Sequence, residues 1–251
     1  MKVMEVPRGN FSANGHAGHF EVPGLLHLVE LRIRSGQEGL NELHNRLLAV
    51  ATLHGSIFKH GIQLWGYNIL SDRVLLVLMP ARPNTFSLAL MNADHGSVSF
   101  WERRYSVCPF ADEVAWRVLR FVDLASLPQG DDPLDPCALN SAAEHAGFLR
   151  HGLLTVPPER LPNPMAWRAF LFSHEDEQFA QALEFCLRTG RPFGPLSFVR
   201  RVEAACGRRV GSSCLKWPGL FAGGGQVPNP CGVRPTQAAA ASPAMQCRSA
   251  V

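Results

Sequence analysis

The sequence predicts an α+β fold, in which an antiparallel sheet with helices on one face is followed by a C-terminal helical region. Two observations support this class. Candidate elements follow the order strand–helix–strand–strand from residue 26 to 79. The run Val74–Pro80 is apolar on both alternate rows, which is typical of a central strand covered on both sides. An apolar residue content of 46% is sufficient for a substantial core.

The first part of the domain reads as a strand and a helix after an irregular leader. Side chains at alternate positions from Leu26 to Arg34 form two rows, one mainly apolar and one that becomes polar toward Arg34, and this pattern predicts a strand. Ser35 is the expected N-cap of the following helix, and Gly55 its expected end. The apolar stripe expected to face the core is formed by Leu40, Leu43, Leu47, Val50 and Ala51.

Two paired strands and further helices are expected next. The strands are 63–69 and 74–79, and Leu70-Ser71-Asp72 supplies turn residues between them. An amphipathic helix begins near Asp112 and stops before Pro128, with Val114, Val118, Phe121 and Val122 on one side. Other helices are expected at 85–94, 138–146, 165–172, 175–187 and 196–205.

Composition shifts divide the chain into four parts. They are an irregular leader (1–21), the α+β domain (22–156), a helical basic C-terminal region (157–210) and a tail (211–251). Pro157–Pro164 reads as the linker. The tail lacks apolar residues that would offset its ordering entropy, and we expect it to be disordered.

Net charge and cysteine content limit the classes of protein and of binding site that the sequence is compatible with. A net charge of +3 and a pI near 8.6 permit a nucleic-acid partner without requiring one. The 7 cysteines contain no C-x-x-C pair, which argues against a disulfide framework or a thiolate zinc site. The N-terminus lacks the apolar core of a signal peptide, and no stretch is long enough to cross a bilayer. A cytoplasmic location is expected.

Three motifs carry a resemblance to a known family. The first is Tyr67 with the strand Arg73-Val74-Leu75 up to Pro80. The second has Trp101, Arg104, Tyr105, Ser106 and Pro109 before a helix that ends Phe121-Val122-Asp123-Leu124-Ala125-Ser126. The third is Thr189-Gly190-Arg191-Pro192 with Gly194, Phe198, Val199 and Gly207-Arg208-Arg209. Together with Pro23, Gly24, His27 and Val29, they resemble the REP-associated tyrosine transposases of the HUH nuclease superfamily.

The resemblance implies transesterification on single-stranded DNA, with a tyrosine nucleophile and a Mg²⁺ or Mn²⁺ held by two histidines. The two ligand positions are Arg73 and Leu75 in this sequence, and the nucleophile position is Phe121. Neither a guanidinium nor a leucine offers a lone pair to a metal, and phenylalanine lacks the attacking oxygen. Ala125-Ser126 replaces the family's Asn-Pro. We therefore expect no intact catalytic residue, no metal ligand set and no cofactor.

The basic and aromatic residues that the family resemblance implies are better retained than the metal-ligand and nucleophile positions. A cluster that could neutralise phosphates consists of Arg188, Arg191, Arg200, Arg201, Arg208 and Arg209. A second patch combines Arg103, Arg104 and Tyr105 beside Trp101, a mixture suited to stacking on unpaired bases. An ordinary solvated helix face is the alternative for the first cluster, and a core position is the alternative for Trp101.

The sequence favours a DNA-binding protein that recognises hairpin or single-stranded DNA without cutting it. An active nuclease with relocated residues is one rival, with Tyr105 as the surrogate nucleophile. A decayed remnant or a protein–protein adaptor of the same fold is another. Tyr67 and His27 are expected in the core, and His16 and His19 in a solvated loop rather than a metal site.

Overall fold

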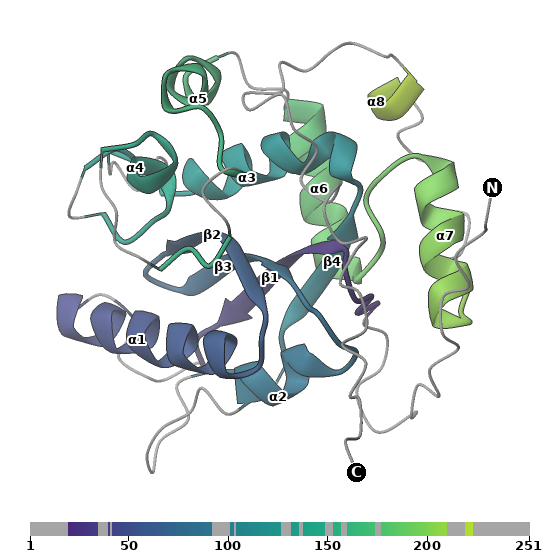
Figure 1. Cartoon of the computed structure of the whole chain (residues 1–251), viewed down its shortest axis with the longest axis horizontal. Coiled ribbons are helices and arrows are strands. Elements are labelled where there is room, and N and C mark those ends of the chain that lie inside the picture. The colour runs from purple at the N-terminus through teal and green to yellow at the C-terminus, as the bar shows by residue number, and fades with distance from the viewer. Residues whose placement is uncertain are drawn as a thin grey trace, which may run out of the picture.

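The sheet at the centre of Figure 1 organises the chain. The computed structural model describes residues 20–34, 40, 42–91, 101–102, 104–126, 132–135, 138–148, 153–156, 160–173, 177–209 and 219–222. Within them, antiparallel strands form one sheet in the order β2-β3-β1-β4. Their bounds are β1 Leu26–Arg32, β2 Gln63–Ile69, β3 Arg73–Met79 and β4 Ser106–Phe110. The α+β class is confirmed.

Strand β3 occupies the interior position that its apolar run predicts. It pairs with β1 on one side and with β2 on the other. Leu75, Val77 and Met79 belong to the hydrophobic core on one face of the sheet. Val74, Leu76 and Leu78 belong to a second core on the opposite face. The β2–β3 hairpin turns at residues 70–72, where the Leu70 N–H donates to the Arg73 carbonyl over 2.9 Å.

Helices lie on both faces of this sheet. The expected cover on one face is present as α1 (Leu43–Lys59) and α2 (Thr85–Met91), which lie below the sheet in Figure 1. The other face is covered from above by α3 (Ala115–Asp123), which continues a 3₁₀ turn (Asp112–Val114), and by α6 (Glu177–Thr189). α7 (Leu196–Cys206) lies beside the sheet in Figure 1. The remaining helices are α4 (Ala142–His145), α5 (Pro164–Leu171) and α8 (Gly219–Ala222).

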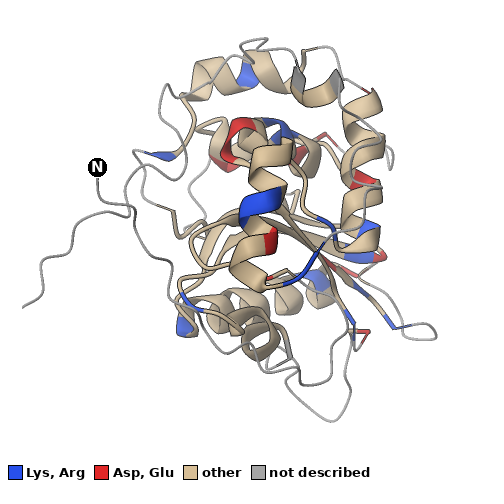
Figure 2. Cartoon of the chain, turned by 90° about the vertical axis from the view of Figure 1, so that its right-hand side faces the viewer, with Lys and Arg blue, Asp and Glu red and all other residues tan. Residues whose placement is uncertain are grey.

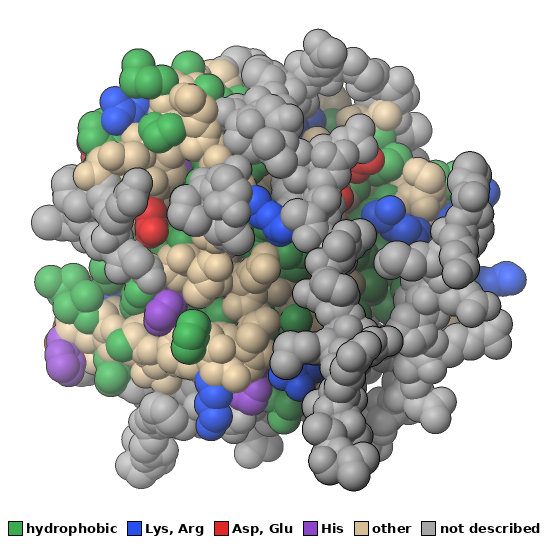
Figure 3. All heavy atoms as spheres, viewed as in Figure 1, with side chains coloured by type: hydrophobic (Ala, Val, Ile, Leu, Met, Phe, Trp, Pro, Cys, Tyr) green, Lys and Arg blue, Asp and Glu red, His purple; other side chains and the backbone are tan. Residues whose placement is uncertain are grey.

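Helix α1 differs from the expectation in both bounds and in its buried face. It begins at Leu43, after Glu42 as its N-cap, and not directly after Ser35. Gly55 does not end the helix, which continues to Lys59, and Leu53 and Ile57 are its buried residues. The predicted core residues Leu43 and Leu47 are 60% and 49% exposed. Leucines surround this helix, so its sequence allows more than one apolar stripe. Figure 3 shows the resulting hydrophobic surface beside histidines over α1.

Strand β4 was not predicted, because it is short and contains Pro109. It lies at the sheet edge, where a missing backbone N–H is tolerated. The segment before α7 lies along this edge: the Phe193 N–H donates to the Pro109 carbonyl over 2.8 Å, and the Ala111 N–H donates to the Phe193 carbonyl over 3.0 Å. Phe193 and Phe198 thereby join the core of the sheet.

The remaining elements follow the expectation within a few residues. α2 covers Thr85–Met91 of the expected 85–94, and residues 92–94 lie outside the described residues. The helix expected at 138–146 is confined to Ala142–His145. Asn163 caps α5 with its side-chain oxygen, and Pro164 occupies the first turn. Of the predicted tail, Gly219–Ala222 forms α8, whose Phe221 packs on Phe193. Ser35, His16 and His19 lie outside the described residues, as do the rest of the tail and residues 1–19 of the leader. Phe20, which was assigned to the irregular leader, is 6% exposed and packs in the core.

No helix in the described ranges combines the length and apolarity that a membrane crossing requires.

Candidate functional site

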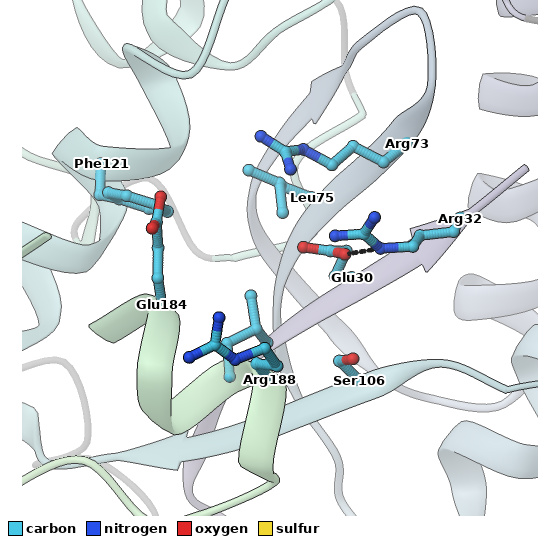
Figure 4. A pocket seen from close by; sticks show the side chains of 9 residues that line it. Glu30, Arg32, Arg73, Leu75, Ser106, Phe121, Glu184 and Arg188 are labelled. Carbon is cyan, nitrogen blue, oxygen red and sulfur yellow. Dashed lines mark hydrogen bonds and ion pairs between the residues drawn. The ribbon is translucent and has the colours of Figure 1, made fainter. Parts of the chain in front are cut away.

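A cavity of about 380 Å³ opens at one end of the sheet, on the face that α3 and α6 cover. Its lining residues come from three strands and two helices, as Figure 4 shows. They are Glu30, Arg32, Arg73, Leu75, Ser106, Phe121, Glu184, Leu187 and Arg188. Phe121, which is distant in sequence from Arg73 and Leu75, thus lines the same cavity as these two residues.

The strand residues reach the cavity through simple alternation. Glu30 and Arg32 are two residues apart on β1, as are Arg73 and Leu75 on β3, so each pair shares one face. The register places Glu30 opposite both Leu75 and Ser106. Closer to the centre of the sheet the same rows become Leu28 and Val77, which are buried in the core. The cavity therefore begins where the core ends.

The buried faces of α3 and α6 hold both helices against the core, and other residues of these helices line the cavity. Val118, Leu119 and Val122 anchor α3, which leaves Phe121 half-buried at the cavity wall. Leu183, Cys186 and Leu187 anchor α6 against the same core. Glu184 and Arg188, one helical turn apart on α6, are exposed and line the cavity.

Positive charge dominates the polar lining. Arg32 and Arg73 stand directly opposite each other on β1 and β3. Arg32 donates from Nε to the Glu30 carboxylate, which is only 9% exposed. The Nε of Arg73 is buried and has no hydrogen-bond acceptor among the described residues. Arg188 adds a third guanidinium from α6, so the cavity offers more donors than acceptors.

The family resemblance implies a divalent metal at this place, and the residues present do not fit one. The cavity carries two carboxylates, Glu30 and Glu184, and Glu30 is bound by Arg32. Guanidiniums stay protonated in proteins and repel a cation. In the part of the chain that the structure describes, no three His, Cys, Asp or Glu side chains are placed to hold a metal ion.

The other predicted DNA-binding arginines lie mostly at the surface. Arg104 is exposed, and Arg103 lies outside the described residues. In the C-terminal arginine cluster predicted from 188 to 209, Arg191 is half-buried. Its Nη1 is buried and has no acceptor in the described ranges. The exposed members of this group are Arg188, Arg200, Arg201, Arg208 and Arg209. Figure 2 shows basic and acidic residues interleaved along the ribbon on this side of the molecule. Of the predicted arginines that the structure describes, only Arg188 lines the cavity.

Two aromatic residues of the predicted stacking patch are buried in the core between the sheet and α1. Trp101 is 5% exposed and Tyr105 is 7% exposed. The Tyr105 hydroxyl lies 2.9 Å from the Ser87 Oγ, and burial raises its pKa. A ring needs an exposed face to stack on a base, and neither ring has one of useful size here.

His27 and Tyr67 are core residues, as predicted. The Val22 N–H donates to Nε2 of His27 over 3.1 Å, so the neutral ring carries its proton on Nδ1 and donates to the Leu25 carbonyl at 2.9 Å. Complete burial lowers the pKa of His27 to about 4, against the hydrogen bonds that raise it. Tyr67 is 3% exposed, and burial followed by the charges of Glu144 and Asp123 raises its pKa.

A buried polar network lies beside this core, and the sequence did not predict it. Asp123 accepts hydrogen bonds from the Ser141 hydroxyl at 2.6 Å, from His145 Nδ1 at 2.8 Å and from Trp167 Nε1 at 3.1 Å. His145 Nε2 donates to the Trp65 carbonyl at 2.9 Å, so both ring nitrogens are donors. Burial lowers the pKa of His145, but the Asp123 charge and these hydrogen bonds outweigh it and raise the pKa. The network joins α3, α4, α5 and β2, and these segments gave no sequence signal of meeting.

No known protein-family model matches the chain. No curated protein matches it. Among solved structures, a REP-associated tyrosine transposase bound to a REP hairpin is similar, with a TM-score of 0.45 and 9% identity. The similarity covers 55% of this chain and 87% of that chain.

Proposed function

We propose that this protein binds hairpin or single-stranded DNA and does not cut it. The observation that carries the proposal is the convergence of Arg73, Leu75 and Phe121 on one cavity. The sequence motifs assign these positions to two metal ligands and a nucleophile, which must meet in one site. Their meeting supports the motif assignment.

The side chains at these positions support loss of cleavage. A phosphotyrosine intermediate needs a phenol, and Phe121 has none. Tyr105 is a poor substitute, because its hydroxyl is buried beside Ser87 on the other side of the sheet. Burial raises the pKa of Tyr67 as well, which opposes formation of a nucleophilic phenolate there.

Exposed arginines support a polyanionic partner. Arg200 and Arg201 lie side by side on α7, and Arg208 and Arg209 follow the Gly207 cap of that helix. Gly207 has φ of 63°, which reverses the chain and keeps the second pair close to the helix end. Lysine and arginine contacts to phosphates release counterions, so affinity should fall as salt rises.

The test is a titration against a hairpin oligonucleotide with a single-stranded overhang, at two salt concentrations. Replacing Arg200 and Arg201 with alanine should lower affinity for every sequence and reduce the salt slope by about 1 for each phosphate that the protein no longer neutralises. The matched control removes Lys59 and Arg82, which are exposed outside this cluster. Equal affinities of the two double variants would rule out the α7 arginines as the DNA-binding residues.

Cleavage is measured on the same samples with Mg²⁺ or Mn²⁺ present. We expect no covalent protein–DNA species on a denaturing gel. A covalent adduct would instead favour an active nuclease with relocated residues. An absence of salt-dependent binding to any oligonucleotide would favour a protein–protein adaptor.

A further inference from the structure

Cationic and apolar side chains both line the cavity, and they alternate along β3 and α6. The cationic side chains, which form the cationic wall, are Arg32, Arg73 and Arg188. The apolar side chains, which form the apolar wall, are Leu75, Phe121 and Leu187. Figure 4 shows the Arg73 and Arg188 side chains extending into the space that Phe121 borders. A ligand that fills this space needs an anionic part and a flat or apolar part.

The cationic wall lacks a partner for part of its charge. Like charges directly opposite on neighbouring strands are unfavourable, and Arg32 and Arg73 are such a pair. Glu30 compensates Arg32. The buried Nε of Arg73 has no acceptor in the described part of the chain, which is unfavourable for a charged donor. An anion in the cavity beside the Arg73 guanidinium would relieve the repulsion between Arg32 and Arg73.

The apolar wall and the volume set the size of the ligand. Phe121 is half-buried and presents an aromatic ring, a surface on which any base can stack. The volume of about 380 Å³ is far larger than a phosphate needs and lies in the range of small-molecule sites. Ser106 and Glu184 add a hydroxyl and a carboxylate that can accept hydrogen bonds from the amino groups of a base.

We infer that this cavity binds one nucleotide without a metal ion, its phosphate at Arg73 and Arg188 and its base against Phe121. The inference deepens the proposed function, in which the nucleotide is an unpaired residue of a bound DNA strand. A free mononucleotide has the same chemistry. The guanidiniums neutralise the phosphate charge at the place where the family resemblance puts a cation.

The test measures binding of deoxyadenosine monophosphate, inorganic phosphate and deoxyadenosine by calorimetry in buffer with EDTA. The mononucleotide should bind about 10-fold more tightly than phosphate or the nucleoside, because each of these lacks one half of the interactions. Equal affinities for phosphate and the mononucleotide would overturn the role of Phe121. Mononucleotide binding that is seen in buffer without EDTA but not in buffer with EDTA would overturn the metal-free site.

Variants locate the site. Arg73→Gln and Arg188→Gln should each weaken mononucleotide binding about 10-fold, and the matched control Arg82→Gln, at an exposed position outside the cavity, should not. Phe121→Leu keeps the wall apolar and should weaken mononucleotide binding while leaving phosphate binding unchanged. Circular dichroism checks the fold of each variant. If Arg188→Gln, which alters an exposed side chain, leaves binding intact, the cavity is not the site.

These results separate this inference from the DNA proposal. Mononucleotide binding with no hairpin binding would retain the pocket and overturn the DNA partner. Hairpin binding with no mononucleotide binding would do the reverse. Competition between a short oligonucleotide and the mononucleotide would assign the pocket to an unpaired residue of a strand, and an absence of competition would assign it to free nucleotides.

Discussion

His145 and Asp123 form a fully buried ion pair, with 2.8 Å between Nδ1 and Oδ2 and no exposed area on either side chain. The pair joins α4 to the end of α3, two residues beyond Phe121 at the cavity wall. Breaking such a pair leaves one buried charge without its partner, which is costly. Loss of either partner should therefore destabilise the end of α3.

Replacing His145 with alanine should lower the free energy of unfolding by about 3–5 kcal/mol, because Asp123 loses its charged partner in a dry site. The matched control is His44→Ala on α1, where the histidine is exposed and the change should stay within about 0.5 kcal/mol. Urea denaturation followed by circular dichroism measures both. A small loss in the His145 variant would mean that the pair is neutral or that water reaches it.

The same pair should make stability depend on pH above neutrality. Because the pKa of His145 is raised in the folded state, its contribution is fully present below the unfolded pKa of about 6.5 and is lost as pH rises through the folded pKa. Unfolding free energy should therefore fall with rising pH above about 6.5, and this component should vanish in His145→Ala. Urea titrations at several pH values provide the measurement, and identical slopes in both proteins would contradict it.

His27 should act in the opposite direction and in a lower pH window. Its folded pKa of about 4 lies below the unfolded value of about 6.5, so the unfolded chain binds more protons between these values. Stability should fall on acidification from about pH 6.5 to 4, by ~3 kcal/mol at 1.36 kcal/mol per unit of pKa difference. His27→Gln retains a donor and an acceptor for the Val22 and Leu25 groups and should remove this dependence. A variant with an unchanged acid slope would assign the slope to other groups.

The sequence predicts the strands well where periodicity is strong. The run Val74–Met79 is apolar on both rows because both faces of β3 are covered, and the strand lies in the interior of the sheet as expected. The stripe predicted for α1 was right at Leu40 and Val50, which pack in or against the core, and wrong at Leu43 and Leu47, which are exposed. Leucines at many angles around this helix leave the choice of buried face to tertiary packing. The cavity could be anticipated only through motifs that assign Arg73, Leu75 and Phe121 to one site. The partners of Asp123 come from separate segments, and no local pattern reveals a long-range polar contact.

Gly66 offers a test of the packing between β2 and α3, and Gly55 on α1 offers the contrast. A Cβ at Gly66 would lie 2.7 Å from Leu119 Cδ2 and 3.3 Å from the Ser141 hydroxyl. Gly66→Ala should therefore destabilise the protein by about 1–3 kcal/mol through overpacking. Gly55 lies within α1, where a Cβ would meet no other atom within 4 Å, so Gly55→Ala should stabilise by about 1 kcal/mol. Opposite shifts in the urea midpoint are expected; a neutral Gly66→Ala would mean that α3 moves away from the sheet without cost.

Restoring the residues that the family resemblance expects provides the strongest test of the site. Arg73→His and Leu75→His place two imidazoles on the same face of β3, and Phe121→Tyr adds a phenol to the same cavity. The triple variant should bind Mn²⁺ and gain about 2.7 kcal/mol of stability at a metal concentration of about 100 times Kd, measured by thermal or urea unfolding. Arg73→His alone is the control, because a single imidazole beside Glu30 should bind the metal far more weakly. If the triple variant folds and gains nothing from Mn²⁺, the three positions do not form a metal and nucleophile site, and the motif assignment behind the proposed function fails.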